Sequence, residues 1–160
     1  MVNRYRPHVL VLPEDDANRQ LANGFHLELP QLRRMQVLIE AGGGDEVLRR
    51  FEVDHIGSMD HYPDRFMVLL IDFDGSAGRL EQAQARIPDR LRERVFILGA
   101  WTEPEALRKA DLGSYEDIGR KLAEDCRAGT DTIWGHDLLR HNAQELGRLR
   151  ERVRPVLFEC

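Results

Sequence analysis

The sequence has little that would indicate a disulfide-rich, secreted or membrane-spanning protein. Its 160 residues include only two cysteines, Cys126 and Cys160, which do not form the CxxC spacing of zinc or redox motifs. No apolar run approaches the roughly 20 residues that cross a bilayer. The first residues also lack the long apolar stretch of a signal peptide. We therefore expect a cytoplasmic protein with free thiols and no membrane partner.

Positive charge and cofactor motifs are scarce as well. Asp and Glu outnumber Lys and Arg by 28 to 23, which gives a formal net charge of −5 at pH 7. A generic nucleic-acid coat would be basic, so that class is disfavoured, whereas an enzyme with a metal-binding acidic cluster is not. Gly42-Gly43-Gly44 lacks the Lys-Ser/Thr of a P-loop, and the six histidines form no HExxH motif. We expect no nucleotide cofactor and no zinc.

Four short runs rich in Val, Ile, Leu and Phe are typical of strands covered on both faces. They span residues 8–12, 35–41, 66–73 and 95–101. Helical patterns separate them, and this alternation predicts a mainly parallel sheet. Further helical patterns span residues 103–110, 114–129 and 131–153. We therefore expect one three-layer α/β domain over residues 1–160, with a core of about 7–110 and a helical C-terminal extension of about 111–160.

Acidic residues follow three of the four predicted strands. Glu14 follows the first, Asp72 and Asp74 end the third, and Glu103 and Glu105 follow the fourth. Ligands of parallel sheets bind beyond the carboxyl ends of the strands, so these side chains are expected at one edge. Carboxylate oxygens select Mg²⁺, Mn²⁺ or Ca²⁺. The pattern therefore predicts a divalent metal site.

The segment IDFDG gives this prediction its strongest support. Residues two apart in a strand share a face, so Asp72 and Asp74 would repel each other unless a cation lay between them. The alternative is structural: Asp72 would bond to backbone amides and Asp74 would cap the next helix. For the fourth strand, Thr102 and Glu105 fit a capping box, which leaves Glu103 as the preferred metal ligand.

These motifs resemble the Toprim family, including OLD-like nucleases and small stand-alone Toprim proteins. Glu14 in VLVLPEDDANRQLANGF matches the family's strand-end glutamate. Asp72 and Asp74 in VLLIDFDGS match its DxD pair, and VFILGAWTEPEALRK resembles the later acidic stretch. The likeness covers roughly residues 7–110. One departure is Asp15, which stands where the family usually has Gly and makes Asp15 and Asp16 further candidate ligands.

The resemblance implies two-metal chemistry on phosphodiester bonds of nucleic acid. Asp72 and Asp74 would hold Mg²⁺ or Mn²⁺, and Glu14 would be a ligand or a general acid/base. The chain carries no ATPase motif, so by analogy with OLD-type enzymes an ATPase partner or a homo-oligomer would complete a nuclease, for example in anti-phage defence. Two alternatives stay open. The domain could be a non-catalytic interaction module, or a receiver-like domain with a phospho-acceptor Asp.

Overall fold

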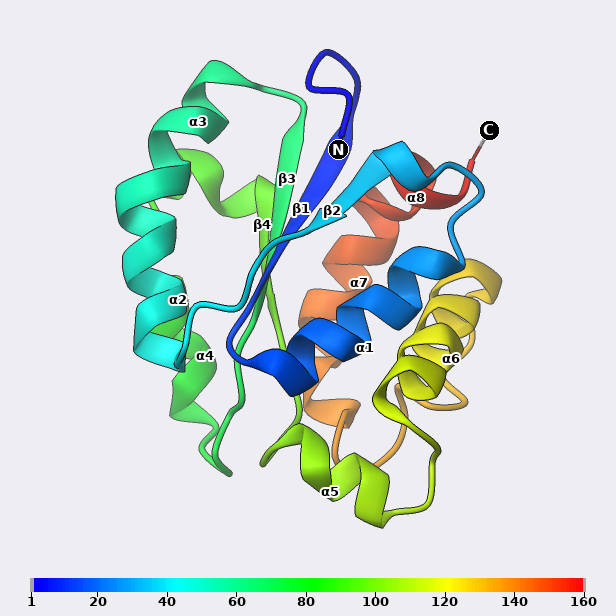
Figure 1. Ribbon diagram of the computed structural model, residues 1–160. Helices are drawn as coiled ribbons and strands as arrows, with labels where there is room; N and C mark the ends of the chain where they lie inside the picture. The colour runs from blue at the N-terminus through cyan, green and yellow to red at the C-terminus, as the bar shows by residue number, and fades with distance from the viewer. Residues whose placement is uncertain (1, 160) are drawn as a thin grey trace.

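The computed structural model describes residues 2–159, and its centre is a sheet of four parallel strands. The strands are β1 (His8–Pro13), β2 (Met35–Val37), β3 (Arg65–Leu70) and β4 (Val95–Leu98), in the order β2-β1-β3-β4. Helices cover both faces of the sheet (Figure 1). The prediction of a three-layer α/β fold with a helical C-terminal part is confirmed.

Side chains of the two central strands alternate between two apolar cores, which explains why their sequences show few polar positions. Val9, Val11 and Val68 point into one core. The helices over it are α1 (Asp16–Leu27), α6 (Tyr115–Ala128), α7 (Ala143–Arg152) and α8 (Arg154–Phe158). Every residue of β1 is buried, as expected for a strand between two helical layers.

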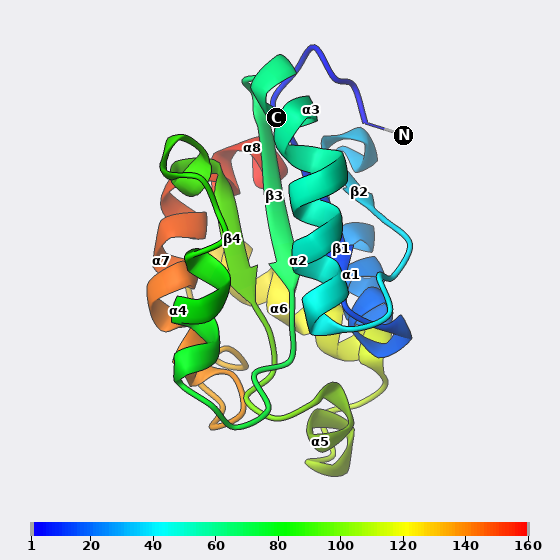
Figure 2. The ribbon, with the colours of Figure 1, turned by 90° about the vertical axis from the view of Figure 1, so that its left-hand side faces the viewer.

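The second core lies on the opposite face and includes Leu10, Leu12 and Met67. The chain segment over it runs through α2 (Gly44–Arg50), the π-helical η2 (Phe51–His55) and α3 (Ile56–His61), and α4 (Gly78–Gln84) lies beside it (Figure 2). The remaining elements are α5 (Pro104–Lys109) and the 3-10 segments η1 (Leu32–Arg34), η3 (Asp89–Arg94) and η4 (Arg140–Asn142). Within residues 2–159, every helix is too short or too polar to cross a lipid bilayer.

The prediction of one or two helices over 131–153 is wrong in the first half of that range, because residues 131–142 form turns and η4. The buried carboxylate of Asp125 accepts hydrogen bonds from the backbone N–H groups of Ile133 (2.6 Å) and Trp134 (3.1 Å). These bonds engage two backbone donors and hold the segment in a loop after α6. The loop in turn directs the Trp134 ring toward the sheet.

At the β4 side of the sheet, the side chain of Asn142 takes the place of a neighbouring strand. Just after β4, the N–H of Gly99 donates to Asn142 Oδ1 (3.1 Å), and its carbonyl accepts from Asn142 Nδ2 (3.0 Å). A carboxamide carries the same donor and acceptor as a peptide group. Asn142 therefore pairs with Gly99 as a neighbouring strand would.

Two glycines allow α1 and α6 to pack closely. A Cβ on Gly119 of α6 would overlap the carbonyl oxygen of Leu21 and lie 2.9 Å from the nitrogen of Phe25. A Cβ on Gly24 of α1 would overlap the carbonyl oxygen of Glu116. Backbone atoms cannot move aside without shifting a whole helix, so this contact fixes the position of α1.

We expect Gly119→Ala to lower the free energy of unfolding by about 2–3 kcal/mol, because the added methyl group forces the two helices apart. The matched control is Gly147→Ala on the exposed side of α7, where nothing lies within 4 Å of an added Cβ. That change should raise stability by up to about 1 kcal/mol. Urea unfolding followed by circular dichroism measures both. Equal effects of the two substitutions would contradict the close helix contact.

Candidate functional site

A crevice is expected between the carboxyl ends of β1 and β3, the two central strands. After β1 the chain passes through α1 on one face of the sheet, and after β3 it passes through α4 on the other. Because these connections diverge, the space between them is the topological switch point, where ligands of open α/β sheets bind. Glu14 directly follows β1, and Asp72 lies two residues beyond β3.

The Glu14 carboxylate binds the backbone of the loop that carries Asp72. Glu14 Oε2 accepts a hydrogen bond from the N–H of Asp72 at 2.6 Å. The Glu14 carbonyl accepts from the N–H groups of Gly42 (2.8 Å) and Gly43 (3.1 Å) in the turn that follows β2. Glu14 thus connects the loops on both sides of β1. The structure brings Glu14 and Asp72 together, as the sequence predicted.

Asn18 holds two carboxylates with one amide group. Its Nδ2 donates to Asp72 Oδ1 and to Asp15 Oδ1, both at 2.9 Å. Asp15 also caps α1, since its Oδ1 accepts from the N–H of Asn18 at 2.9 Å. Asn18 is only 1% exposed and Asp72 only 7% exposed. A neutral donor therefore fixes the orientation of a buried carboxylate.

Burial sets the electrostatics of the site. It raises the pKa of Asp72 from 3.8 to about 7, and the charges of Glu14, Asp15 and Glu105 add to this, while the Asn18 hydrogen bond opposes it. Burial also raises the pKa of Glu14, which the hydrogen bond from Asp72 and the charge of Arg79 oppose. The hydrogen bonds and the charge of Arg79 thus offset only part of the effect of burial on these two adjacent carboxyl groups. Such groups attract either protons or a cation.

The other predicted ligands lie further out. Asp74 is exposed and sits in a left-handed turn (φ 52°), so the strand alternation that predicted a shared face with Asp72 does not apply to it. Its charge nevertheless raises the pKa of Glu14. Among residues 2–159, no three His, Cys, Asp or Glu side chains converge into a ready metal cage.

The predicted capping box at Thr102 is wrong, because Glu103 itself is the N-cap residue of α5 and its side chain makes no capping bond. Glu103 is exposed. Glu105, the second residue of α5, is half-buried, and its charge contributes to the raised pKa of Asp72. Of the two glutamates, Glu105 is therefore the one whose charge acts on Asp72.

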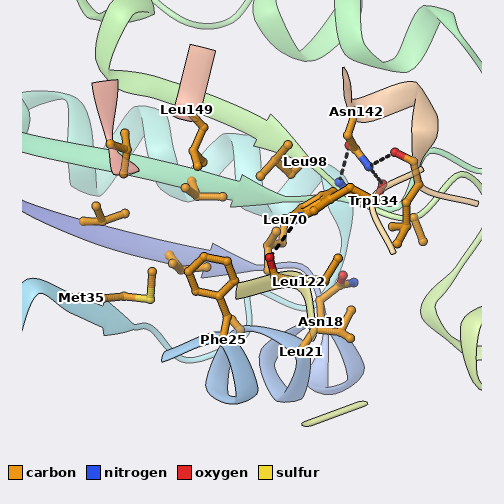
Figure 3. A pocket seen from close by; sticks show the side chains of 18 of the residues that line it. Asn18, Leu21, Phe25, Met35, Leu70, Leu98, Leu122, Trp134, Asn142 and Leu149 are labelled. Carbon is orange, nitrogen blue, oxygen red and sulfur yellow. Dashed lines mark hydrogen bonds between the residues drawn. The ribbon is translucent and has the colours of Figure 1, made fainter. Parts of the chain in front are cut away.

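An apolar cavity lies beside the site, between the sheet and helices α1, α6 and α7 (Figure 3). Leu21, Phe25, Leu98 and Trp134 line it together with Asn18, whose side-chain amide binds Asp72. Its volume is about 80 Å³, smaller than the roughly 150 Å³ cavity that holds one benzene. A nucleotide or an organic cofactor does not fit. The cavity instead keeps the surroundings of Asn18 apolar, which is consistent with the raised pKa of Asp72.

Two residues of the site were missed by sequence reasoning, Asn18 and Arg79. Asn18 lies on the buried face of α1 with Ala17, Leu21 and Ala22, and a polar residue on an apolar helix face was a usable signal. Arg79 lies on α4 and its charge lowers the pKa of Glu14. No local pattern distinguished it from the many other arginines of the chain.

Stability should depend on pH through Asp72 when no metal is added. Between about pH 4 and pH 7 the folded protein holds a proton on Asp72 that the unfolded chain releases, so the free energy of unfolding falls as the pH rises through this range. In EDTA, Asp72→Asn should flatten this fall by about 1–2 kcal/mol between pH 5 and pH 7. The exposed Glu151→Gln should follow the wild-type curve. Parallel curves for Asp72→Asn and wild type in urea unfolding would contradict the raised pKa.

No protein-family model, no curated protein and no solved structure matches this chain. The Toprim resemblance therefore rests on the motifs around Glu14, Asp72 and Asp74, and stays a prediction.

Proposed function

We propose that this protein binds Mg²⁺ or Mn²⁺ at Glu14 and Asp72 and hydrolyses phosphodiester bonds of nucleic acid. The observation that carries the proposal is the pair of the buried Asp72 and the half-buried Glu14 at the switch point of the sheet, joined by the 2.6 Å bond from the N–H of Asp72 to the Glu14 carboxylate. The resemblance of the surrounding motifs to Toprim nucleases supports the choice of reaction. A requirement for an ATPase partner stays a prediction.

The donor set fits a hydrated magnesium ion. Mg²⁺ keeps several waters and is commonly held by one or two carboxylates together with substrate phosphates. Glu14 and Asp72 provide two such groups, so a cage of three carboxylates is not required. Asp74, on the turn beside them, belongs to the proposed ligand set because its charge acts on Glu14. Glu103 stays a predicted outer ligand.

Each residue would have a separate role in hydrolysis. Asp72, oriented by Asn18, would be the fixed ligand. Glu14, whose pKa burial raises, would accept a proton from the attacking water. A bound divalent ion would supply charge stabilisation at the phosphoryl oxygens and acidify a water molecule.

Purified protein incubated with plasmid, single-stranded DNA or RNA should cut at least one of them in Mn²⁺ or Mg²⁺ and none in EDTA. Asp72→Asn and Glu14→Gln should each slow cutting by roughly 100-fold or more, since each removes a metal or proton-transfer group. Glu151→Gln, an exposed acid on α7, is the matched control and should cut like wild type. Cutting that survives in Asp72→Asn would refute the assigned site. No metal binding and no cutting by the wild type would favour the interaction module.

A phospho-acceptor role for Asp72 is the second candidate. The observation that favours it is the placement of Asp72 after a central strand, next to the acidic residues Glu14 and Asp15. With acetyl phosphate and Mg²⁺, an Asp72 carboxylate oxygen would attack phosphorus and acetate would leave. Intact-protein mass spectrometry should then detect one added phosphoryl group in wild type and none in Asp72→Asn. An unmodified wild-type protein would eliminate this candidate.

A further inference from the structure

Arg79 reaches from the first turn of α4, which follows β3, to the first residue of α2, which follows β2. Its Nη2 lies against Gly44, the residue with which α2 begins. In the sheet, β1 lies between β2 and β3. The contact at Gly44 brings Arg79 near Glu14, because the N–H of the preceding residue, Gly43, donates to the Glu14 carbonyl (3.1 Å). The charge of Arg79 lowers the pKa of the Glu14 carboxyl group.

The space for the Arg79 guanidinium exists because residue 44 has no side chain. A Cβ on Gly44 would overlap Nη2 and lie 3.2 Å from Cζ of Arg79. The other side of this position is closed by Ile71, whose Cγ2 would lie 3.1 Å from the same Cβ. Gly44 and Ile71 thus leave a slot for the guanidinium, and Ile71 directly precedes Asp72 in the chain.

Within residues 2–159, no carboxylate binds the Arg79 guanidinium. Comparable arginines do have such partners: Arg86, two residues after α4, pairs with Glu52, and Arg19 on α1 pairs with Glu40 at 2.9 Å. The nearby Glu14 uses Oε2 to bind the Asp72 backbone instead. Arg79 is half-buried. Its guanidinium therefore places a positive charge at the site, and its N–H groups are available to a ligand.

We propose that Arg79 binds a phosphate group of the nucleic-acid strand and holds it over Glu14 and Asp72. This inference rests on the proposed function and names the residue that recognises the substrate's charge. A guanidinium offers parallel N–H donors that match two phosphate oxygens. The acidic site would otherwise repel a polyanion, so one arginine placed among the carboxylates supplies the attraction that the net charge of −5 does not.

The test measures binding of a fluorescein-labelled oligonucleotide by anisotropy, in Ca²⁺, and binding of Mn²⁺ alone by electron paramagnetic resonance. Arg79→Ala should weaken oligonucleotide binding roughly 10- to 100-fold and leave Mn²⁺ affinity within about threefold. Arg79→Lys should restore part of the loss, because it keeps the charge without the paired donors. The matched control is Arg33→Ala. Arg33 is exposed and lies just before β2, at the amino ends of the strands, so this variant should bind like wild type.

Two further measurements separate phosphate binding from a structural role. Gly44→Ala keeps the arginine but fills its slot, so it should weaken oligonucleotide binding like Arg79→Ala while the protein remains folded by circular dichroism. A set of oligonucleotides with a single neutral methylphosphonate linkage should contain one position that weakens binding to wild type. The same position should have no effect on binding to Arg79→Ala.

The outcomes distinguish this inference from the proposed function. Wild-type affinity in Arg79→Ala, or an unchanged methylphosphonate effect in that variant, would overturn the role of Arg79, and metal-dependent cutting would still support the nuclease. A wild-type protein that binds neither Mn²⁺ nor any oligonucleotide would overturn both.

Discussion

The hydrogen bond from the Asp72 backbone to the Glu14 carboxylate is the contact on which the site depends. It ties the end of β1 to the end of β3 at 2.6 Å and brings one acidic side chain beside another acidic residue. The bond uses a backbone N–H, so it forms whatever the charge of the Asp72 side chain. Asn18 then fixes that side chain with a neutral donor. The fold itself therefore brings the carboxyl groups together, and burial and their mutual repulsion raise the pKa of Asp72.

The arrangement of the helices serves the same end. The close contact of α1 with α6 at Gly24 and Gly119 fixes the helix that carries Asn18. The apolar cavity beside this helix surrounds the Asn18 side chain with apolar residues. Without both, the amide would turn more freely and the carboxyl group would be better solvated. Asn18 thus links the packing of α1 to the orientation of the Asp72 carboxylate.

Much of the fold follows from local sequence. The apolar runs around Val9, Val68 and Phe96 predicted the position of three strands correctly, although β3 and β4 end three residues earlier than expected, at Leu70 and Leu98. The second strand was overextended, because 35–41 is apolar enough for a strand but pairs with β1 only over Met35–Val37. The residues after Val37 were predicted as strand because they are apolar, but a partly buried loop can be equally apolar.

The parts of the site that the sequence did not reveal depend on contacts between distant positions. Asn18 and Asp72 are separated by 54 residues, and Arg79 is defined by the slot at Gly44. Neither pairing leaves a spacing that a motif could detect. The turn at Asp74 was hidden for a different reason. The two aspartates of a DxD motif share one face only while the chain stays extended. Here β3 already ends at Leu70.

The pairing of Asn142 with Gly99 has a consequence for how the molecule behaves in a crowded solution. An open strand at the margin of a sheet invites strands of other molecules to attach, which leads to clumping or exchange of segments between chains. Beyond the last residue of β4, both backbone groups that a foreign strand would use at Gly99 are already taken by the carboxamide. A single side chain thus ends the growth of the sheet at that point, and it leaves the opposite margin, with its three-residue strand β2, as a short and poor template for association.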